Sequence, residues 1–325
     1  MKLFEHEDFG PILTETTAWL KEQHGLERIS AQIVEKDYYV TQVLRAIATN
    51  FSGTVLFKGG TSLSKGWGLI QRFSEDVDLF LNPKAFDPPL GESRIQKTLF
   101  KMRDMVGEQQ GLTWLRNDSK VDKKSRGDVY GYKAHYEDNP DIPSEVLMEA
   151  GIRSGHYPNE QISLDSYVAE FLRTRGLGDI AEDLEPFPMT LLHFRRTFVE
   201  KLYTIYSKVE LMVSNNEPSL GDNARHYYDL AQLARRPEVQ TMFRSPEEME
   251  EIIDDYYTVT EKHFPKTPLP DDRRLCNSRA HFPDRILRAS LANTYSVQCG
   301  RLCYTRDYPT FDEVLGEFEK IREFI

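Results

Sequence analysis

Two aspartates separated by one residue, Asp76 and Asp78, are the strongest chemical feature of this 325-residue sequence. They lead into an apolar run that ends at Leu81 and predicts a β-strand. Residues two apart on a strand project to the same face, so both carboxylates point together while Val77 and Leu79 pack behind them. Carboxylates about 6–7 Å apart repel unless a cation lies between them. Magnesium prefers oxygen ligands and bridges carboxylates to substrate phosphates, so the pair predicts a magnesium site.

A glycine turn, Gly59-Gly60-Thr61-Ser62, comes shortly before the aspartates. It follows the β-rich run Thr54-Val55-Leu56-Phe57 and precedes a predicted helix, for which Thr61 or Ser62 is the expected N-cap. Glycines let a ligand approach the backbone closely, and a helix N-terminus offers unpaired N–H groups to an anion. The turn lacks the Gly-Lys-Ser/Thr ending of a P-loop. The order of elements therefore predicts a phosphate site next to a metal site. Further side chains that could contact the phosphates are Lys58, Ser64, Lys65 and Arg72.

An Asp-x-Asp pair alone has other interpretations. It is common on exposed strands, and it occurs as the metal motif of some glycosyltransferases and phosphatases. Phosphatases have an apolar run directly before the first aspartate, where this chain has Arg72, Ser74 and Glu75. A glycosyltransferase would need a nucleotide-binding α/β half ahead of the motif, and none is evident.

Composition limits the class of protein. Hydrophobic residues at 39% are typical of a folded chain, and the net charge of −11 argues against a surface coated for nonspecific nucleic-acid binding. No apolar run approaches the length of a membrane helix, the N-terminus has no signal-peptide pattern, and three cysteines indicate a reducing compartment. We therefore expect a cytoplasmic protein without membrane partners. Basic residues cluster locally, at 120–126, 195–196 and 273–274.

Hydrophobic periodicity predicts two parts. Helices are expected at 29–49, with Ser30 as N-cap, and at 92–108, and strands at 54–57, 77–81 and 146–149, with two or three more between 112 and 137. Long helices are expected near 194–213, 223–236, 246–263 and 309–324. We predict a mixed α/β part over residues 1–190 and a mainly helical part over residues 191–325.

Several segments resemble the AbiEii/AbiGii-type nucleotidyltransferase toxins of the DNA polymerase β-like superfamily. The two specific segments are Phe57-Lys58-Gly59-Gly60-Thr61-Ser62-Leu63-Ser64 and Arg72-Phe73-Ser74-Glu75-Asp76-Val77-Asp78-Leu79. Three further ones are Glu35-Lys36-Asp37-Tyr38, Arg196-Thr197-Phe198-Val199-Glu200-Lys201-Leu202 and Arg225-His226-Tyr227-Tyr228-Asp229-Leu230, of which the last two are weak alone. The resemblance spans residues 35–230, and nothing beyond about residue 235 contributes to it.

The resemblance implies an α+β fold, with a small mixed sheet and flanking helices, plus a helical C-terminal domain that completes the active site. It also implies transfer of a nucleoside monophosphate from a nucleoside triphosphate (NTP). Two magnesium ions, or manganese instead, would be held by Asp76, Asp78 and a third carboxylate, for which Glu149 is the candidate. Lys201 and Asp229 would act in catalysis, with Lys201 on the nucleotide phosphates. Nucleotide binding would involve Lys58, Gly59, Gly60, Thr61, Ser62 and Arg72.

Alternatives remain for individual residues. Glu149 could be an ordinary solvent-facing strand residue, and Lys201 an exposed helix residue paired with a glutamate. Arg72 could tie down its own loop by pairing with Glu75. Asp229 could equally be a surface carboxylate on a helix.

The resemblance further implies an RNA acceptor, with the 3′ end of transfer RNA (tRNA) as the expected one. It implies a toxin of a toxin–antitoxin or phage-defence (abortive infection) system, neutralised by a separately encoded antitoxin. Two alternatives stay open. The chain could nucleotidylate a protein, or it could be a catalytically weak module that only binds a nucleotide or a partner.

Overall fold

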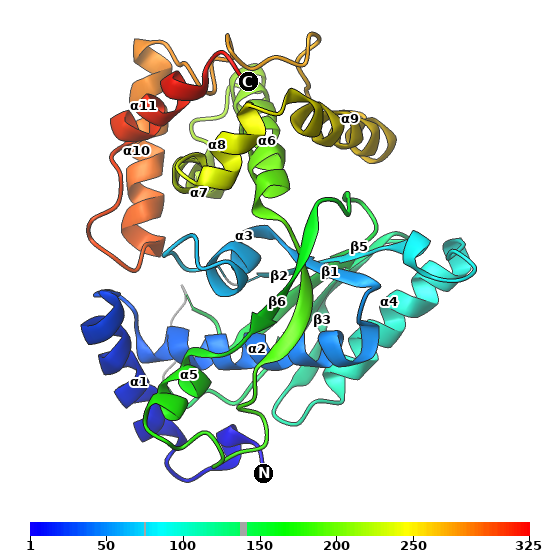
Figure 1. Cartoon of the computed structure of the whole chain (residues 1–325), viewed down its shortest axis with the longest axis vertical. Helices are drawn as coiled ribbons and strands as arrows, with labels where there is room; N and C mark the ends of the chain where they lie inside the picture. Colours follow the sequence, from blue (N-terminus) through cyan, green and yellow to red (C-terminus); the bar gives the residue numbers. More distant parts are fainter. Residues whose placement is uncertain (75, 137–141) are drawn as a thin grey trace. The chain divides into compact units, whose positions relative to one another are not determined.

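The chain divides into two compact units, Met1–Leu192 and His193–Ile325, which are described separately (Figure 1). The computed structural model describes residues 1–74, 76–136 and 142–325. The first unit is mixed α/β and the second is helical within these residues, which confirms the predicted fold class. No helix in the described ranges is both long and apolar enough to cross a membrane.

The first unit contains a seven-stranded mixed sheet with the order β3-β4-β5-β2-β1-β7-β6. The strands are β1 (Val55–Lys58), β2 (Asp76–Leu81), β3 (Thr113–Val121), β4 (Ser125–Gly131), β5 (Glu145–Gly151), β6 (Asn159–Leu164) and β7 (Phe187–Leu192). β2 pairs parallel with β5, and β1 pairs parallel with β7. The other neighbours are antiparallel. The central strands β2 and β1 thus lie between segments that are distant in sequence.

Helices pack against the sheet of the first unit. They are α1 (Phe9–His24), α2 (Ala31–Phe51), α4 (Glu92–Gly107) and α5 (Tyr167–Thr174). α2 runs along the sheet with α1 and α5 beside it, and it contacts β1, β5 and β7 (Figure 1). Its predicted N-cap is confirmed, because the Ser30 side chain accepts a hydrogen bond from the Ile33 N–H. Burying the apolar faces of α2 and of the sheet builds the core that supports β1 and β2.

The second unit consists of α6 (Phe194–Ser214), α7 (Arg225–Ala234), α8 (Pro237–Phe243), α9 (Pro246–His263), α10 (Arg285–Leu302) and α11 (Phe311–Ile321). A short 3₁₀ turn lies at Gly221–Ala224 in this unit, and two others lie in the first unit, at Leu3–Glu5 and Pro83–Ala85. α7 contacts α6, α10 and α11, so its apolar face lies at the centre of the helical packing. Tyr227 illustrates this, since it is fully buried on α7 and packs edge-to-face on Phe311 of α11.

The helix after the glycine turn differs from the prediction. It begins at Gly59 itself, as α3 (Gly59–Thr61), and continues as a single π-helical turn, η2 (Ser62–Gly66). Neither Thr61 nor Ser62 is the N-cap, which is Lys58 without a side-chain cap bond. The helix ends at Gly66. Gly68 has a φ of 62°, a left-handed conformation that a continuing right-handed helix does not contain.

Candidate functional site

Asp76 and Asp78 project from the same face of β2, as their spacing predicts. Both are half-buried, whereas Val77 and Leu79 between and beside them are 0% and 2% exposed on the opposite face. The apolar residues fix which way the strand faces, because a shift of one residue would bury both carboxylates. The strand thus holds two acidic side chains at the surface of a rigid sheet.

Three charged residues stand level with one another across neighbouring strands. Asp78 pairs in register with Lys58 on β1 and with Glu149 on β5. Residues paired in register share a face of the sheet, so the predicted third carboxylate, Glu149, lies on the strand next to Asp78. Partial burial raises the pKa of the Glu149 carboxyl, and the negative charge of Asp78 raises it further, while Lys58 and Lys120 act in the opposite direction. Negative charge therefore accumulates on this face.

The glycine turn is in direct contact with the aspartate strand. Gly59 has a φ of 78°, and a Cβ atom built on it would overlap the carboxylate of Asp78. The hydroxyl of Thr61 donates a hydrogen bond of 2.6 Å to the backbone oxygen of Asp76. Only glycine at position 59 lets the turn and the carboxylate come this close. The predicted phosphate site and the predicted metal site are therefore adjacent in space.

Several side chains predicted to contact phosphate hold the turn together in this structure. The buried Ser62 hydroxyl donates to the Gly59 carbonyl at 3.0 Å. Arg72 is 1% exposed and donates to the carbonyl of Phe73 at 2.9 Å. A Cβ atom on Gly60 would lie 2.9 Å from Nη2 of Arg72, so the guanidinium packs under the turn. The alternative partner proposed for Arg72, Glu75, lies outside the described residues.

Lys65 is held by a residue that sequence reasoning did not single out for this role. Its ammonium group lies 2.6 Å from the carboxylate of Asp37 on α2, and the ion pair is largely buried. Asp37 also accepts a hydrogen bond of 2.9 Å from the backbone N–H of Tyr167 at the start of α5. Asp37 therefore joins α2, η2 and α5. From the sequence it was noted only as a member of the segment Glu35-Lys36-Asp37-Tyr38, with no predicted role of its own.

Lys201 and Asp229 form a buried ion pair within the second unit. The Lys201 Nζ lies 2.8 Å from Oδ2 of Asp229 and 2.9 Å from Nδ1 of His226. Asp229 is fully buried and Lys201 is 7% exposed. The alternatives of an exposed lysine paired with a glutamate and of a surface aspartate are therefore wrong. A lysine held in this way has its ammonium group in a fixed place.

The donor set on β2 fits a hard divalent cation, because carboxylate oxygens are what such ions prefer. Within the described ranges, no three histidine, cysteine, aspartate or glutamate side chains form a group able to hold a metal ion. Magnesium is commonly held by one or two carboxylates together with substrate phosphates, so a pair of aspartates beside the predicted phosphate site fits such an ion. The assignment of Glu149 as a third ligand stays a prediction.

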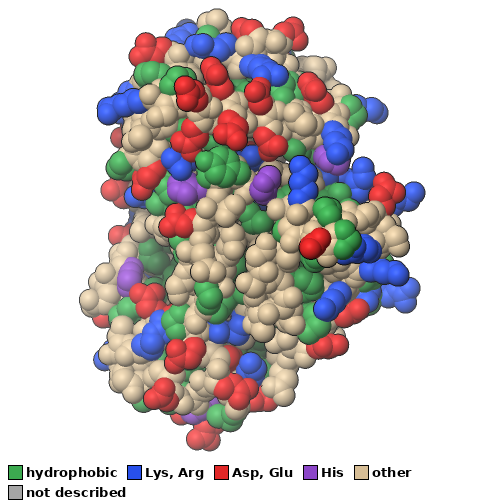
Figure 2. Space-filling view, turned by 45° about the vertical axis from the view of Figure 1, so that its right-hand side comes forward, with side chains coloured by type: hydrophobic (Ala, Val, Ile, Leu, Met, Phe, Trp, Pro, Cys, Tyr) green, Lys and Arg blue, Asp and Glu red, His purple; other side chains and the backbone are tan. Residues whose placement is uncertain are grey.

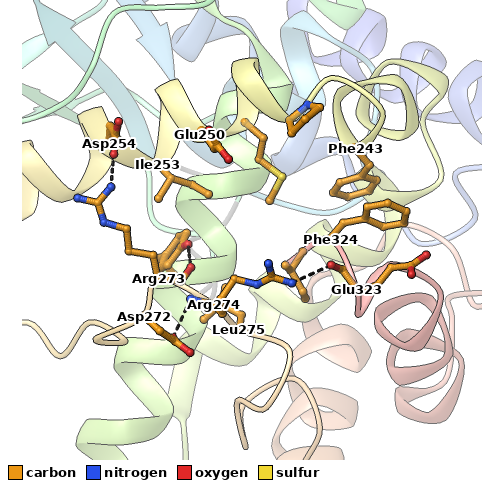
Figure 3. Close-up of a pocket in the computed structure, with 14 residues that line it drawn as sticks. Phe243, Glu250, Ile253, Asp254, Asp272, Arg273, Arg274, Leu275, Glu323 and Phe324 are labelled. Carbon is orange, nitrogen blue, oxygen red and sulfur yellow. Dashed lines mark hydrogen bonds and ion pairs between the residues drawn. The ribbon is translucent and has the colours of Figure 1, made fainter.

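A separate cavity of about 450 Å³ lies in the second unit, between α9, the loop at 272–275 and the residues after α11 (Figure 3). Phe243 and Phe324 stack at one end of it, with ring centroids 5.4 Å apart. Arg273 pairs with Asp254, and Arg274 donates a hydrogen bond to the backbone oxygen of Glu323. None of the predicted site residues lines this cavity.

Comparison with solved structures defines the class of fold. The chain is similar to MenT4, a nucleotidyltransferase toxin from Mycobacterium tuberculosis H37Rv, at 16% sequence identity and a TM-score of 0.52. The similarity covers 94% of this chain and 95% of MenT4. No curated protein matches the sequence significantly.

A family model described as "Nucleotidyl transferase AbiEii toxin, Type IV TA system" matches residues 42–317. The chain therefore belongs to the AbiEii family of nucleotidyltransferase toxins, which confirms the resemblance found in the sequence. It is a nucleotidyltransferase of a family associated with type IV toxin–antitoxin systems.

Proposed function

We propose that this protein transfers a nucleoside monophosphate from an NTP to the 3′ end of an RNA, with tRNA as the acceptor, in a magnesium-dependent reaction. The observation that carries the proposal is the contact between Gly59 and Asp78. It sets a turn suited to phosphates directly against the carboxylates suited to a metal. Both parts are needed for phosphoryl transfer, which relies on positioning and charge neutralisation.

Each residue has a proposed role. Gly59 and Gly60 leave room for the triphosphate at the backbone, and Thr61 and Ser62 hold the turn with their hydroxyls. Lys58 stands level with Asp78 and would offset the phosphate charge. Arg72 braces the turn from beneath.

Asp76 and Asp78 would hold magnesium, with Glu149 as the third carboxylate. When bound, two such ions activate the attacking hydroxyl and stabilise the leaving pyrophosphate. In the second unit, Lys201 is proposed to contact the nucleotide phosphates, with Asp229 keeping its ammonium group in place.

The biological role follows from the family. We propose that the protein acts as a toxin in the cytoplasm, where NTPs and tRNA are present, and that a separately encoded antitoxin neutralises it. A phage-defence role by abortive infection is part of this proposal. The family description supports an antitoxin partner.

A transfer assay tests the reaction. The protein is incubated with magnesium, tRNA and each of the four NTPs labelled on the α-phosphate, and label in RNA is measured. We expect Asp76→Asn and Asp78→Asn to lower the rate by at least about a hundredfold, since each removes charge from the metal site. Glu22→Gln, an exposed carboxylate change on α1, should have no effect.

The outcomes distinguish the alternatives. Label in a protein acceptor but never in RNA would identify the protein-modifying activity. NTP binding without transfer to any acceptor would identify a binding module. Full activity in Asp78→Asn would reject the proposed site.

A further inference from the structure

The row of paired residues that contains Asp78 extends to the edge of the sheet. Asp78 on β2 is in register with Glu149 on β5, Glu149 with Gly127 on β4, and Gly127 with Lys120 on β3. Because paired residues share a face, Lys120 projects from the same side of the sheet as the carboxylates. An exposed cation thus stands at the outer end of the row that leads to the proposed active site.

Gly127 leaves a gap in this row. A Cβ atom added there would meet only the side chain of Leu147, at 3.5 Å, which is ordinary contact. Neither neighbouring side chain nor backbone requires a glycine at this position. Its effect is to leave the space between Lys120 and Glu149 without a side chain.

The region around Lys120 is basic in an acidic protein. Residues 92–131 contain nine lysines and arginines against six aspartates and glutamates, whereas the whole chain has a net charge of −11. Lys123, in the turn between β3 and β4, is exposed like Lys120. Lysine and arginine side chains gather on the right of the space-filling view (Figure 2). Positive charge placed locally on a negative protein attracts an anionic partner to that place.

We propose that Lys120 and Gly127, here called the Lys120–Gly127 strip, bind the backbone of the acceptor RNA and direct its 3′ end toward Asp78. This inference rests on the proposed transfer function and adds the position of the acceptor RNA on the protein. The gap at Gly127 admits the strand between Lys120 and Glu149, and Lys120 neutralises one of its phosphates.

The geometry sets the length of RNA that the strip can reach. Lys120 and Asp78 are separated by three strand spacings of about 4.8 Å, which is about 14 Å. A stacked strand rises about 3.4 Å per nucleotide, so Lys120 meets a phosphate about four nucleotides from the reacting end. An acceptor shorter than this ends before it reaches Lys120.

An acidic protein segment would also be attracted to lysines, but RNA fits the strip better. The strip leads into the carboxylate row, where an acidic side chain would meet Asp78 and Glu149 and be repelled. An RNA acceptor instead brings a neutral 3′ hydroxyl to Asp78 at that end of the row.

Two variants test the strip by different means. Lys120→Ala removes the charge, whereas Gly127→Val fills the gap without changing the charge, and valine suits a strand. Transfer is measured with synthetic RNA acceptors from two to ten nucleotides long, while the KM values for acceptor and NTP are determined separately. Lys21→Ala on α1, another exposed lysine, is the matched control, and thermal melting shows whether each variant is folded.

For Lys120→Ala we expect the acceptor KM to rise about fivefold at 0.1 M salt, the effect of losing one phosphate contact on a single strand. The slope of log KM against log salt should fall by about 0.7. The KM for NTP should not change. The effect should be present with acceptors of six or more nucleotides and absent with those of two or three. Gly127→Val should raise the acceptor KM at every length that crosses β4.

Unchanged acceptor KM values in both folded variants would overturn the proposed role of the strip in RNA binding. The proposed transfer function would remain intact. If the wild-type protein transfers nucleotide only to a protein and Lys120→Ala weakens that reaction, the partner of the strip is an acidic protein and the RNA proposal is wrong. If the wild-type protein transfers nothing to any acceptor, the proposed function itself has failed.

Discussion

Gly59 combines an unusual backbone conformation with a role in the proposed chemistry. Its φ of 78° is strained for any residue with a side chain, and its missing Cβ makes room for the Asp78 carboxylate. Gly53 has a similar φ of 70°, but a Cβ there would contact nothing within 4 Å. A substitution at either glycine would strain the backbone, but only at Gly59 would the added Cβ atom meet Asp78.

This difference leads to a matched pair of predictions. Gly59→Ala and Gly53→Ala should each lose about 1–2 kcal/mol of stability from the left-handed backbone. Gly59→Ala should also lose transfer activity by at least about a hundredfold, because the new methyl group displaces Asp78. Gly53→Ala should keep wild-type activity. Activity and thermal melting of both proteins check this, and an active Gly59→Ala would contradict the proposed geometry.

Glu35 on α2 gives the first unit a pH dependence. The carboxyl is 2% exposed and accepts a hydrogen bond from the backbone N–H of His135 at 2.8 Å. Burial raises its pKa from 4.5 to about 7, against the opposing effect of backbone hydrogen bonds. The folded state therefore binds the proton more tightly than the unfolded state, and stability falls as pH rises from 4.5 to 7.

Glu35→Gln should remove this loss of stability at higher pH. We expect the variant to be more stable than the wild type at pH 8, by up to about 3 kcal/mol, and the difference to disappear near pH 4.5. Melting temperatures measured from pH 4.5 to 8 test the sign. A variant that is less stable than the wild type at pH 8 would show that the ionised carboxylate is instead stabilising.

Among the elements, β4 carries a buried ion pair on the face opposite the strip. Asp128 is fully buried and accepts two hydrogen bonds from Arg126, at 2.8 and 2.6 Å. The indole N–H of Trp114 donates to the same carboxylate at 3.1 Å, and the guanidinium lies over the Phe100 ring of α4. The pair joins β3, β4 and α4.

Removing one partner leaves a buried charge uncompensated. We expect Asp128→Ala to destabilise the protein by about 3–5 kcal/mol, measured from the urea midpoint. Asp118→Ala, an exposed change on β3, should stay within about 0.5 kcal/mol of the wild type. If Asp128→Ala leaves the stability unchanged, then Arg126 finds water or another partner, and the pair does not hold the hairpin to α4.

Local patterns predicted the elements with strong periodicity. α2, β2, α4 and α9 appear where apolar spacing placed them, because their buried faces repeat in sequence. β7 was not predicted, since Pro188 weakens a strand signal and its pairing with β1 is long-range. β6 is mostly polar and lies at the edge of the sheet. α8 is short, and α10 has few buried residues, so neither gives a clear pattern.

The site was predictable only where it depended on short-range geometry. The shared face of Asp76 and Asp78 follows from the two-residue period of a strand. The register that sets Glu149 beside Asp78, and Lys120 at the end of the same row, comes from strand pairing that no local pattern specifies. The contact of Gly59 with Asp78 likewise exists only in the folded sheet.

At the scale of the whole molecule, residues with a proposed role in the reaction belong to both units. Asp76 and Asp78 belong to the first unit, and Lys201 and Asp229 belong to the second. Because Lys201 is paired with a fully buried aspartate, loss of activity on its removal could come from lost stability alone. A double substitution separates the two causes.

Lys201→Met should lose transfer activity and about 3–5 kcal/mol of stability, since Asp229 remains as a buried charge without its lysine. Lys201→Met combined with Asp229→Leu should recover most of that stability, because an apolar pair replaces the ions. Its activity should stay lost. Chemical denaturation and the transfer assay test this together, and a stable, active double variant would remove Lys201 and Asp229 from the proposed mechanism.

The most direct test is a crystal structure of the full chain with magnesium and a triphosphate analogue that cannot be hydrolysed. We expect the phosphates to lie against Gly59 and Gly60, with magnesium about 2.1 Å from carboxylate oxygens of both Asp76 and Asp78. An analogue bound only elsewhere, for example in the cavity between α9 and the loop at 272–275, with no ion at the two aspartates, would contradict the proposed site.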